Sequence, residues 1–195
     1  MSCGPTPWSL LLAPGAGADR NQPALIALDM RASSLGARVR RMDFPYRKAG
    51  RKAPDRPSVL LQAVLDEVAG LRSPDPLVLG GRSMGGRICS MAVAHGLGPG
   101  VAAAGLFLVS YPLHPPGRPE KLRADHFSAL EIPCLFVSGT RDAFATPAEL
   151  ETATEVIPGP VTHHWIEGGN HGLRNADSEV GDVATAWLGG LGLVR

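Results

Sequence analysis

The sequence predicts an α/β fold: a doubly wound, mostly parallel sheet of about six strands, forming one domain over residues 1–195. Two observations predict it. Continuous apolar runs of strand length recur along the chain, and segments with helical periodicity lie between them. A chain of 195 residues buries about 70% of its unfolded surface on folding, which is enough for a single core. Right-handed crossovers would then cover both faces of the sheet with helices.

Six apolar runs are predicted to be strands, of which the second is the weakest. They span residues 8–13, 39–44, 76–80, 105–109, 133–137 and 161–166. The predicted helices span residues 24–35, 60–71, 86–95, 147–154 and 178–188. In the second helix Leu60, Val64 and Val68 recur on one face, opposite Gln62 and Asp66. That pattern is typical of a helix packed on a sheet.

Composition and charge exclude several classes of protein. The 19 Lys and Arg residues nearly balance the 18 Asp and Glu residues, so no net field favours nucleic acid or an anionic membrane as a partner. No apolar stretch approaches the roughly 20 residues that cross a bilayer. The three cysteines, Cys3, Cys89 and Cys134, form no C-x-x-C motif. We therefore expect free thiols, no disulfide framework, no zinc site and a cytoplasmic protein.

The segment Gly81-Arg82-Ser83-Met84-Gly85 matches the pattern G-x-S-x-G. Alone this match is weak, but it follows a predicted strand and precedes a predicted helix, as a nucleophile elbow must. Small residues two before and two after the serine let such a sharp turn pack, and Ser83 would hold a strained backbone. The alternative is a glycine-rich turn with a helix-capping serine.

A serine nucleophile needs a base, and the base needs an orienting acid. Asp142 and His171 follow the fifth and sixth predicted strands, which gives the chain order Ser, Asp, His that this architecture requires. Each has a simpler interpretation: an Asx-turn or helix cap for Asp142, and a solvated loop histidine for His171. All three positions follow strand ends, where ligands of open α/β sheets bind.

Acyl transfer also requires donors aimed at the developing oxyanion. The amide of Met84, directly after the serine, is the first candidate. For the second we expect Ala16, with Gly15 as the runner-up, in the loop that follows the first strand. A nucleotide-binding loop is disfavoured because no Lys-Ser or Lys-Thr follows and Arg20 breaks the G-x-G-x-x-G pattern.

Five segments together suggest a family. They are Pro14-Gly-Ala-Gly17, Gly80-Gly-Arg-Ser-Met-Gly-Gly-Arg87, Tyr111-Pro-Leu-His-Pro-Pro-Gly117, Gly139-Thr-Arg-Asp142 and Gly168-Gly-Asn-His171. The chain resembles, over essentially its whole length, the small α/β-hydrolases related to dienelactone hydrolases. That family includes bacterial predicted hydrolases, a testis-expressed hydrolase-like protein and a hydrolase-like subunit of a nuclear acetyltransferase complex. The resemblance implies an α/β-hydrolase fold with Ser83, Asp142 and His171 at the triad positions.

Two positions depart from the family pattern. Pro14 stands where the first loop commonly has His, which leaves the side-chain support of that loop open. Ser83 stands where dienelactone hydrolases proper have a cysteine nucleophile, so dienelactone specificity is not implied. Cys89, in the helix after the serine, should be an inert buried thiol.

The spacing of the predicted triad limits the architecture around it. Only 58 residues separate Ser83 from Asp142, which leaves no room for a lid domain. We therefore expect a shallow open cleft bounded by Tyr111, Leu113 and His114, from the Pro-rich loop 110–120. These three side chains could equally pack on their neighbours. Arg82 and Arg87 flank the elbow and could attract an acidic substrate, although surface salt bridges would explain them as well.

These observations predict a serine hydrolase that cleaves small esters or thioesters through an acyl-enzyme. The alternative is a hydrolase-like binding module without physiological turnover. A small-molecule substrate is the expected partner, and neither a metal nor a cofactor is indicated. The sequence leaves the physiological substrate, the acyl-chain length, the leaving group and the oligomeric state open.

Overall fold

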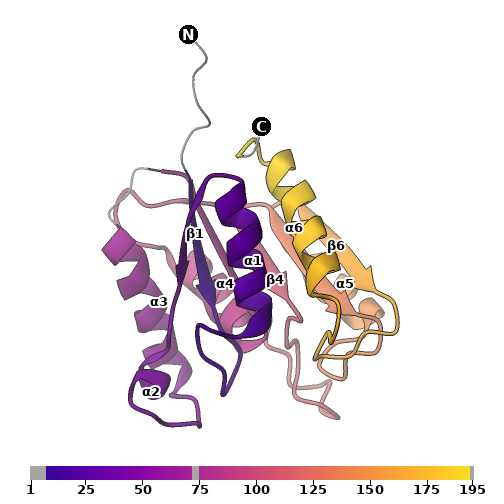
Figure 1. Ribbon diagram of the computed structural model, residues 1–195. Coiled ribbons are helices and arrows are strands. Elements are labelled where there is room, and N and C mark those ends of the chain that lie inside the picture. The colour runs from indigo at the N-terminus through magenta and orange to yellow at the C-terminus, as the bar shows by residue number, and fades with distance from the viewer. Residues whose placement is uncertain (1–7, 72–74, 194–195) are drawn as a thin grey trace.

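A computed structural model describes residues 8–71 and 75–193, and its centre is a six-stranded parallel sheet (Figure 1). The strands are β1 (Trp8–Ala13), β2 (Ala37–Arg41), β3 (Leu77–Arg82), β4 (Ala103–Val109), β5 (Cys134–Gly139) and β6 (Val161–Ile166). Their order is β2-β1-β3-β4-β5-β6, and every neighbouring pair is parallel. The chain winds outward in both directions from β1, which confirms the predicted doubly wound sheet.

Helices cover both faces of the sheet, giving three layers. One face packs on α1 (Pro23–Ser34) and α6 (Asp177–Gly190), whose buried side chains share a core cluster with Leu10, Val78 and Leu135. The other face carries α2 (Pro45–Lys48), α3 (Pro57–Leu71), α4 (Met84–His95), α5 (Pro147–Thr154) and the short 3₁₀ helix η1 (Phe127–Ala129). Because β1 and β5 are buried along their whole length, their sequences are continuously apolar or small.

The second predicted strand is present but begins and ends earlier than expected. The run 39–44 was expected to be the second strand, but β2 begins at Ala37 and ends at Arg41. Met42 donates one more backbone hydrogen bond to Leu12, and Pro45 then begins α2 with Phe44 as its N-cap. Proline fixes the backbone for a first helical turn, so the strand cannot continue. The other five predicted strands and all five predicted helices are confirmed within a few residues.

The segment between Ser83 and Asp142 contains only α4, β4, η1 and β5 with their loops, and no lid is present among these described residues. Over residues 8–71 and 75–193, none of the helices combines the length and the apolar character needed to cross a membrane. Cys3 lies outside the described residues.

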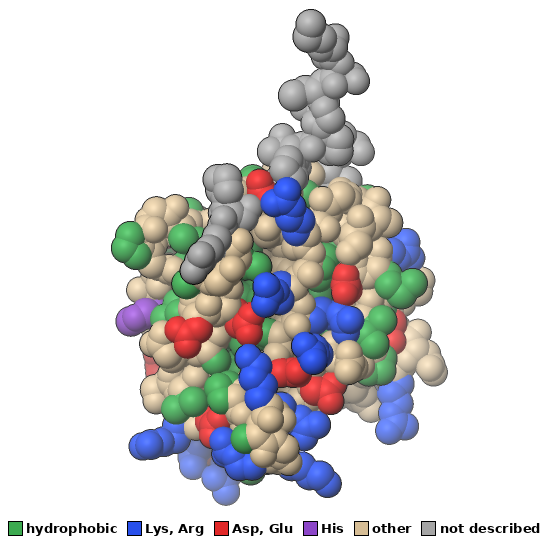
Figure 2. All heavy atoms as spheres, turned by 60° about the vertical axis from the view of Figure 1, so that its left-hand side comes forward, with side chains coloured by type: hydrophobic (Ala, Val, Ile, Leu, Met, Phe, Trp, Pro, Cys, Tyr) green, Lys and Arg blue, Asp and Glu red, His purple; other side chains and the backbone are tan. Residues whose placement is uncertain are grey.

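Basic side chains gather at the lower end of the molecule, around α2 and the segment that leads into α3 (Figure 2). The segment 47–56, from the end of α2 toward α3, contains five basic residues: Arg47, Lys48, Arg51, Lys52 and Arg56. Three are paired with carboxylates, Arg47 with Asp19, Lys48 with Glu67 and Arg51 with Asp55. The hydroxyl of Tyr46 accepts a hydrogen bond from the amide of Gly17, just beyond β1. This cationic surface therefore borders the edge where the carboxyl ends of the strands meet.

Candidate active site

The turn between β3 and α4 holds Ser83 in a strained conformation. Its φ of 51° and ψ of −119° lie where residues other than glycine are rare. Its amide donates to the carbonyl of Val109 on the neighbouring strand, at 2.8 Å. The Ser83 side chain makes no capping hydrogen bond to α4, so the simpler interpretation as a helix cap does not describe it. The Ser83 hydroxyl contacts His171 instead.

Two glycines allow this turn to form. A Cβ on Gly85 would meet the backbone carbonyls of Ala13 and Pro14, and a Cβ on Gly81 would lie 2.6 Å from the amide nitrogen of Gly86. Backbone atoms cannot move aside as a flexible side chain can, so both positions require glycine. The expected role of the small residues that flank Ser83 is confirmed.

His171 joins the serine to the acid. Its Nε2 lies 2.8 Å from Ser83 Oγ, and its Nδ1 lies 2.8 Å from Oδ2 and 3.0 Å from Oδ1 of Asp142. Because an ionised carboxylate can only accept, Nδ1 carries the ring proton in this arrangement. The lone pair of Nε2 is then free to accept the proton of the serine hydroxyl. The structure thus brings together the three residues selected from the sequence.

Asp142 is the most enclosed member of the three, with 2% of its surface exposed. Its Oδ1 also accepts a hydrogen bond from the amide of Phe144, at 2.8 Å. This contact is the Asx-turn that was the simpler interpretation of Asp142, so the same carboxylate closes the turn and orients the imidazole. A buried acid with two donors has its position fixed before any substrate arrives.

Two further residues hold His171, and neither was assigned this task from the sequence. The ring of Phe144 stacks on the imidazole with centroids 4.0 Å apart and planes inclined by 29°. The Arg82 guanidinium donates to the backbone carbonyl of His171 at 2.6 Å. Burial lowers the pKa of Arg82, and the carboxylates of Asp177 and Asp142 oppose that change. Phe144 has no local sequence signal, whereas Arg82 lies next to the nucleophile.

Met84 and Ala16, the two residues expected to stabilise an oxyanion, line the same cleft as Ser83. In the described chain neither the Met84 amide nor the Ala16 amide donates a hydrogen bond, and both residues line the cleft. Gly15, the runner-up, donates instead to Oε1 of Gln22 at 3.0 Å. The side chain of Gln22 therefore supports this loop, whereas Pro14 has no hydrogen-bond donor to offer. Because the Gly15 amide is engaged, the geometry favours Ala16 over Gly15 as the oxyanion donor.

An open cleft of about 500 Å³ lies in front of Ser83 and His171. It is walled by the loop after β1, the segment before α3, the first turn of α4 and the loops after β4 and β5. The remaining lining residues are Gly15, Ala16, Gln22, Pro54, Asp55, Pro57, Leu60, Arg82, Met84, Arg87, Pro112, Arg123 and Phe144. Gly15 thus lines the cleft as expected.

The expectation that Tyr111, Leu113 and His114 bound the cleft is wrong. All three are buried, with at most 4% of their surface exposed, and none lines the cleft. The Tyr111 ring packs edge-on to Phe136, and Leu113 joins the same core cluster. His114 Nε2 lies 3.3 Å from Oε2 of Glu149. The loop turns its apolar side chains under itself because burial stabilises them, and it presents Pro112 and Arg123 to the cleft instead.

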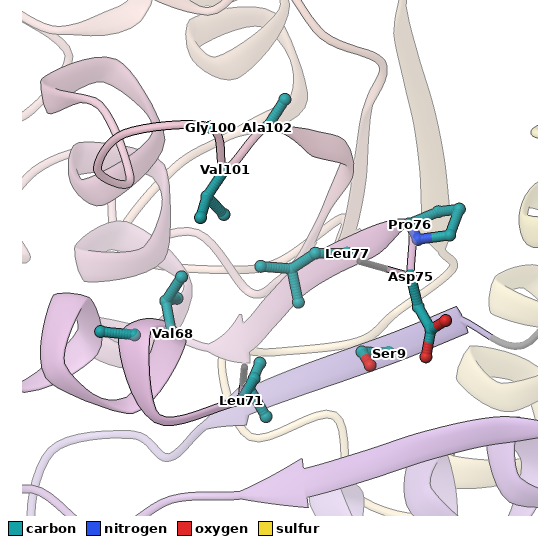
Figure 3. A pocket seen from close by; sticks show the side chains of 10 residues that line it. Ser9, Val68, Leu71, Asp75, Pro76, Leu77, Gly100, Val101 and Ala102 are labelled. Carbon is teal, nitrogen blue, oxygen red and sulfur yellow. The ribbon is translucent and has the colours of Figure 1, made fainter. Parts of the chain in front are cut away.

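A second cleft of about 520 Å³ lies at the opposite edge, where β1, β3 and β4 begin (Figure 3). Ser9, Leu77 and Val101 are among its lining residues. Its only ionisable lining residue in the described chain is Asp75, which pairs with Arg38 at 3.0 Å. Among its described lining residues there is no histidine beside a serine, so they do not repeat the arrangement found at Ser83.

The described cysteines take no part in the site. Cys89 and Cys134 are free and buried, and burial raises the pKa of each to about 12. Protonated thiols of this kind are poor nucleophiles at neutral pH. The expectation that Cys89 is a buried thiol in the helix after Ser83 is confirmed.

Comparison with known proteins gives the same fold. A family model for the alpha/beta hydrolase domain matches residues 7–186. Among solved structures, Est1E from Butyrivibrio proteoclasticus is 13% identical, with a TM-score of 0.79 over 96% of this chain and 90% of that one. A dienelactone hydrolase from Anabaena variabilis is 18% identical, with a TM-score of 0.76 over 98% and 88%. An alpha-beta serine hydrolase homologue from Coxiella burnetii is 21% identical, with a TM-score of 0.75 over 93% and 85%.

Proposed function

We propose that this chain, which belongs to the alpha/beta hydrolase family, is a serine hydrolase that cleaves small esters or thioesters through an acyl-enzyme. The observation that carries the proposal is the line of contacts from Ser83 Oγ through His171 to the buried Asp142, each at 2.8 Å. A nucleophile, a base and an orienting acid within hydrogen-bond reach are what this chemistry requires.

In the first half-reaction, Nε2 of His171 takes the hydroxyl proton as Ser83 Oγ attacks the substrate carbonyl carbon. The carbonyl oxygen gains negative charge, which the amides of Met84 and Ala16 stabilise. Asp142 stabilises the imidazolium that forms. When the tetrahedral species collapses, the bond to the leaving oxygen or sulfur breaks, and His171 returns the proton to that atom.

In the second half-reaction, water replaces the leaving group. His171 takes a proton from the water as its oxygen attacks the acyl carbon, and the same two amides stabilise the charge again. The bond to Ser83 Oγ then breaks, and His171 returns the proton to the serine. The products are a carboxylic acid and the alcohol or thiol released earlier, and the enzyme is regenerated.

The open cleft favours a small substrate. Without a lid to enclose a long chain, binding relies on the walls around Ser83, and a cleft of about 500 Å³ suits a compact acyl group. The same proposal includes a small-molecule partner and a cytoplasmic location. It also includes a place among the small hydrolases related to dienelactone hydrolases.

Hydrolysis of 4-nitrophenyl acetate tests the proposal. The Ser83→Ala variant should lose about 10³-fold or more in kcat, because triad members act as a unit. Ser128→Ala, at an exposed serine of η1, is the matched control and should retain the wild-type rate. Equal rates in wild type and Ser83→Ala would contradict the proposal. A folded wild type without turnover would also contradict it and would leave the binding-module alternative.

A further inference from the structure

The cleft beside Ser83 carries an excess of positive charge. Its described lining includes three guanidinium groups, Arg82, Arg87 and Arg123, and one carboxylate, Asp55. Asp55 is already paired with Arg51, at 2.7 Å. The basic surface around α2 (Figure 2) borders the same edge of the sheet, because Tyr46 of α2 contacts Gly17 just beyond β1. The net charge of the whole chain is only +1, so the positive charge of this cleft is a local excess.

The three arginines differ in what they contact. Arg82 is engaged, because its guanidinium donates to the carbonyl of His171. Arg87 and Arg123 have no hydrogen-bond or ion-pair partner for their side chains in the part of the chain that the structure describes. The surface salt bridges that might have explained Arg87 are therefore not formed with any described residue. Moreover, Arg87 Nε is shielded from solvent with no acceptor.

Arg87 and Arg123 also repel each other. Burial, and secondly the charge of Arg87, lower the pKa of the Arg123 guanidinium. Arg87 and Arg123 lie close together with no paired carboxylate among the described residues, and the shielded N–H of Arg87 has no acceptor there, which is unfavourable. An anion between them would remove both penalties, because guanidinium groups bind carboxylates and phosphates through paired hydrogen bonds.

The framework holds both arginines in place. Arg87 lies on the first turn of α4, and its amide donates to the carbonyl of Ser83 at 3.1 Å. Arg123 is fixed through its backbone: its amide donates to Leu113 at 2.8 Å, and its carbonyl accepts from the Tyr111 hydroxyl at 2.7 Å. The buried Tyr111 and Leu113 thus act on the cleft indirectly, by placing Arg123.

We propose that Arg87 and Arg123 form a subsite for an anionic group, a carboxylate or a phosphate, carried by the ester or thioester substrate. The proposal rests on the proposed function, since it names the substrate class of the same cleft. An anion held there would lie beside Ser83 and would orient the reacting carbonyl toward it. The basic surface around α2 would favour the approach of such substrates.

A matched pair of esters tests the subsite by kinetics. Mono-4-nitrophenyl glutarate carries a free carboxylate, and methyl 4-nitrophenyl glutarate carries the same chain without the charge. The wild type should favour the anionic ester in kcat/KM by about 10- to 100-fold, the usual range for charge-assisted hydrogen bonds. Arg87→Gln and Arg123→Gln should each bring this ratio toward one, and Arg123→Lys should retain part of it.

Arg118→Gln is the matched control, because Arg118 is exposed in the same loop and does not line the cleft. It should keep the wild-type ratio between the two esters. A wild type that does not distinguish them, or a ratio unchanged in both Arg→Gln variants, would overturn the subsite.

A binding measurement separates this proposal from the proposed function. Glutarate or inorganic phosphate should raise the Tm of the Ser83→Ala protein, which needs no turnover, and the shift should disappear when Arg87→Gln and Arg123→Gln are added. The anion with the larger shift identifies the favoured group. If neither anion raises the Tm, the subsite is wrong. If both esters resist hydrolysis but the Arg-dependent shift persists, the proposed function fails and the subsite remains.

Discussion

The carboxylate of Asp142 closes the turn after β5 and also contacts Nδ1 of His171. Its Oδ1 accepts from the amide of Phe144, and both oxygens lie within 3.0 Å of His171 Nδ1. The first contact requires only an oxygen, whereas the second requires an acceptor that keeps the proton on Nδ1. The two roles can therefore be separated by substitution.

Asp142→Asn is the substitution that separates them. The amide oxygen can still close the turn, but the amide group can donate to Nδ1 and favour the wrong imidazole tautomer. We expect kcat on 4-nitrophenyl acetate to fall on the order of 10⁴-fold, with a Tm within a few degrees of wild type. Circular dichroism and steady-state kinetics on the same preparation check this. A folded variant with near wild-type kcat would show that Asp142 does not orient the base.

At the scale of elements, the elbow depends on the absence of a side chain at Gly85. We expect Gly85→Ala to lower the free energy of unfolding by about 1 to 3 kcal/mol, because the new Cβ meets backbone carbonyls that cannot retreat. Gly70→Ala, in α3 with no atom within 4 Å of its added Cβ, is the matched control and should leave stability unchanged or slightly raised. Urea denaturation measures both. Equal stabilities of the two variants would contradict the account of the elbow.

Most elements could be predicted because the sheet is covered on both sides. Buried parallel strands such as β3 and β5 are continuous apolar runs, and the helices that cover them repeat their apolar residues with helical spacing. The bounds of the edge strand β2 were less clear, because it alternates half-buried and exposed residues, among them Arg38 and Arg40. The helix α2 was not predicted, because four residues are too few to show a period.

The contact among Ser83, His171 and Asp142 could be predicted because each of them follows a strand, and strand ends of a parallel sheet meet at one edge. The residues that form the walls of the cleft could not be predicted in this way. Sequence places the loop 110–120 at that edge but does not say which side chains turn inward. Tyr111 and Leu113 are apolar enough to be buried, and Arg123, beyond the Pro-rich stretch, takes the position expected for them. No local pattern marks Arg123 or Phe144.

At the scale of the whole molecule, stability should depend on pH through partly buried histidines. Burial, and secondly the charge of Arg87, lower the pKa of His126 from about 6.5 to about 4. Its Nε2 lies 2.7 Å from the hydroxyl of the buried Ser90. Between these values the unfolded chain binds a proton at this residue that the folded chain does not. The contribution of His126 to the free energy of unfolding should therefore be complete above about pH 6.5. It should decrease as the pH falls toward about 4.

His126→Gln isolates this contribution. Allowing for the partial exposure of the ring, we expect the wild type to lose about 1 to 2 kcal/mol more than the variant between pH 7 and pH 4.5. Urea denaturation at both pH values measures the difference. Burial also lowers the pKa of His163, so a further loss of stability on acidification is expected in both the wild type and His126→Gln. Equal losses in the two proteins would show that His126 does not titrate as described.

Covalent labelling is a direct test of the proposal that Ser83 is an activated nucleophile. A fluorophosphonate reacts with a serine whose proton is accepted by a neighbouring base, and the phosphonyl oxygen then occupies the position of the oxyanion. We expect one adduct per folded chain by intact-mass spectrometry, located on Ser83 by peptide mapping and strongly reduced in Asp142→Asn. A folded protein that stays unlabelled, or an adduct on another serine, would contradict it.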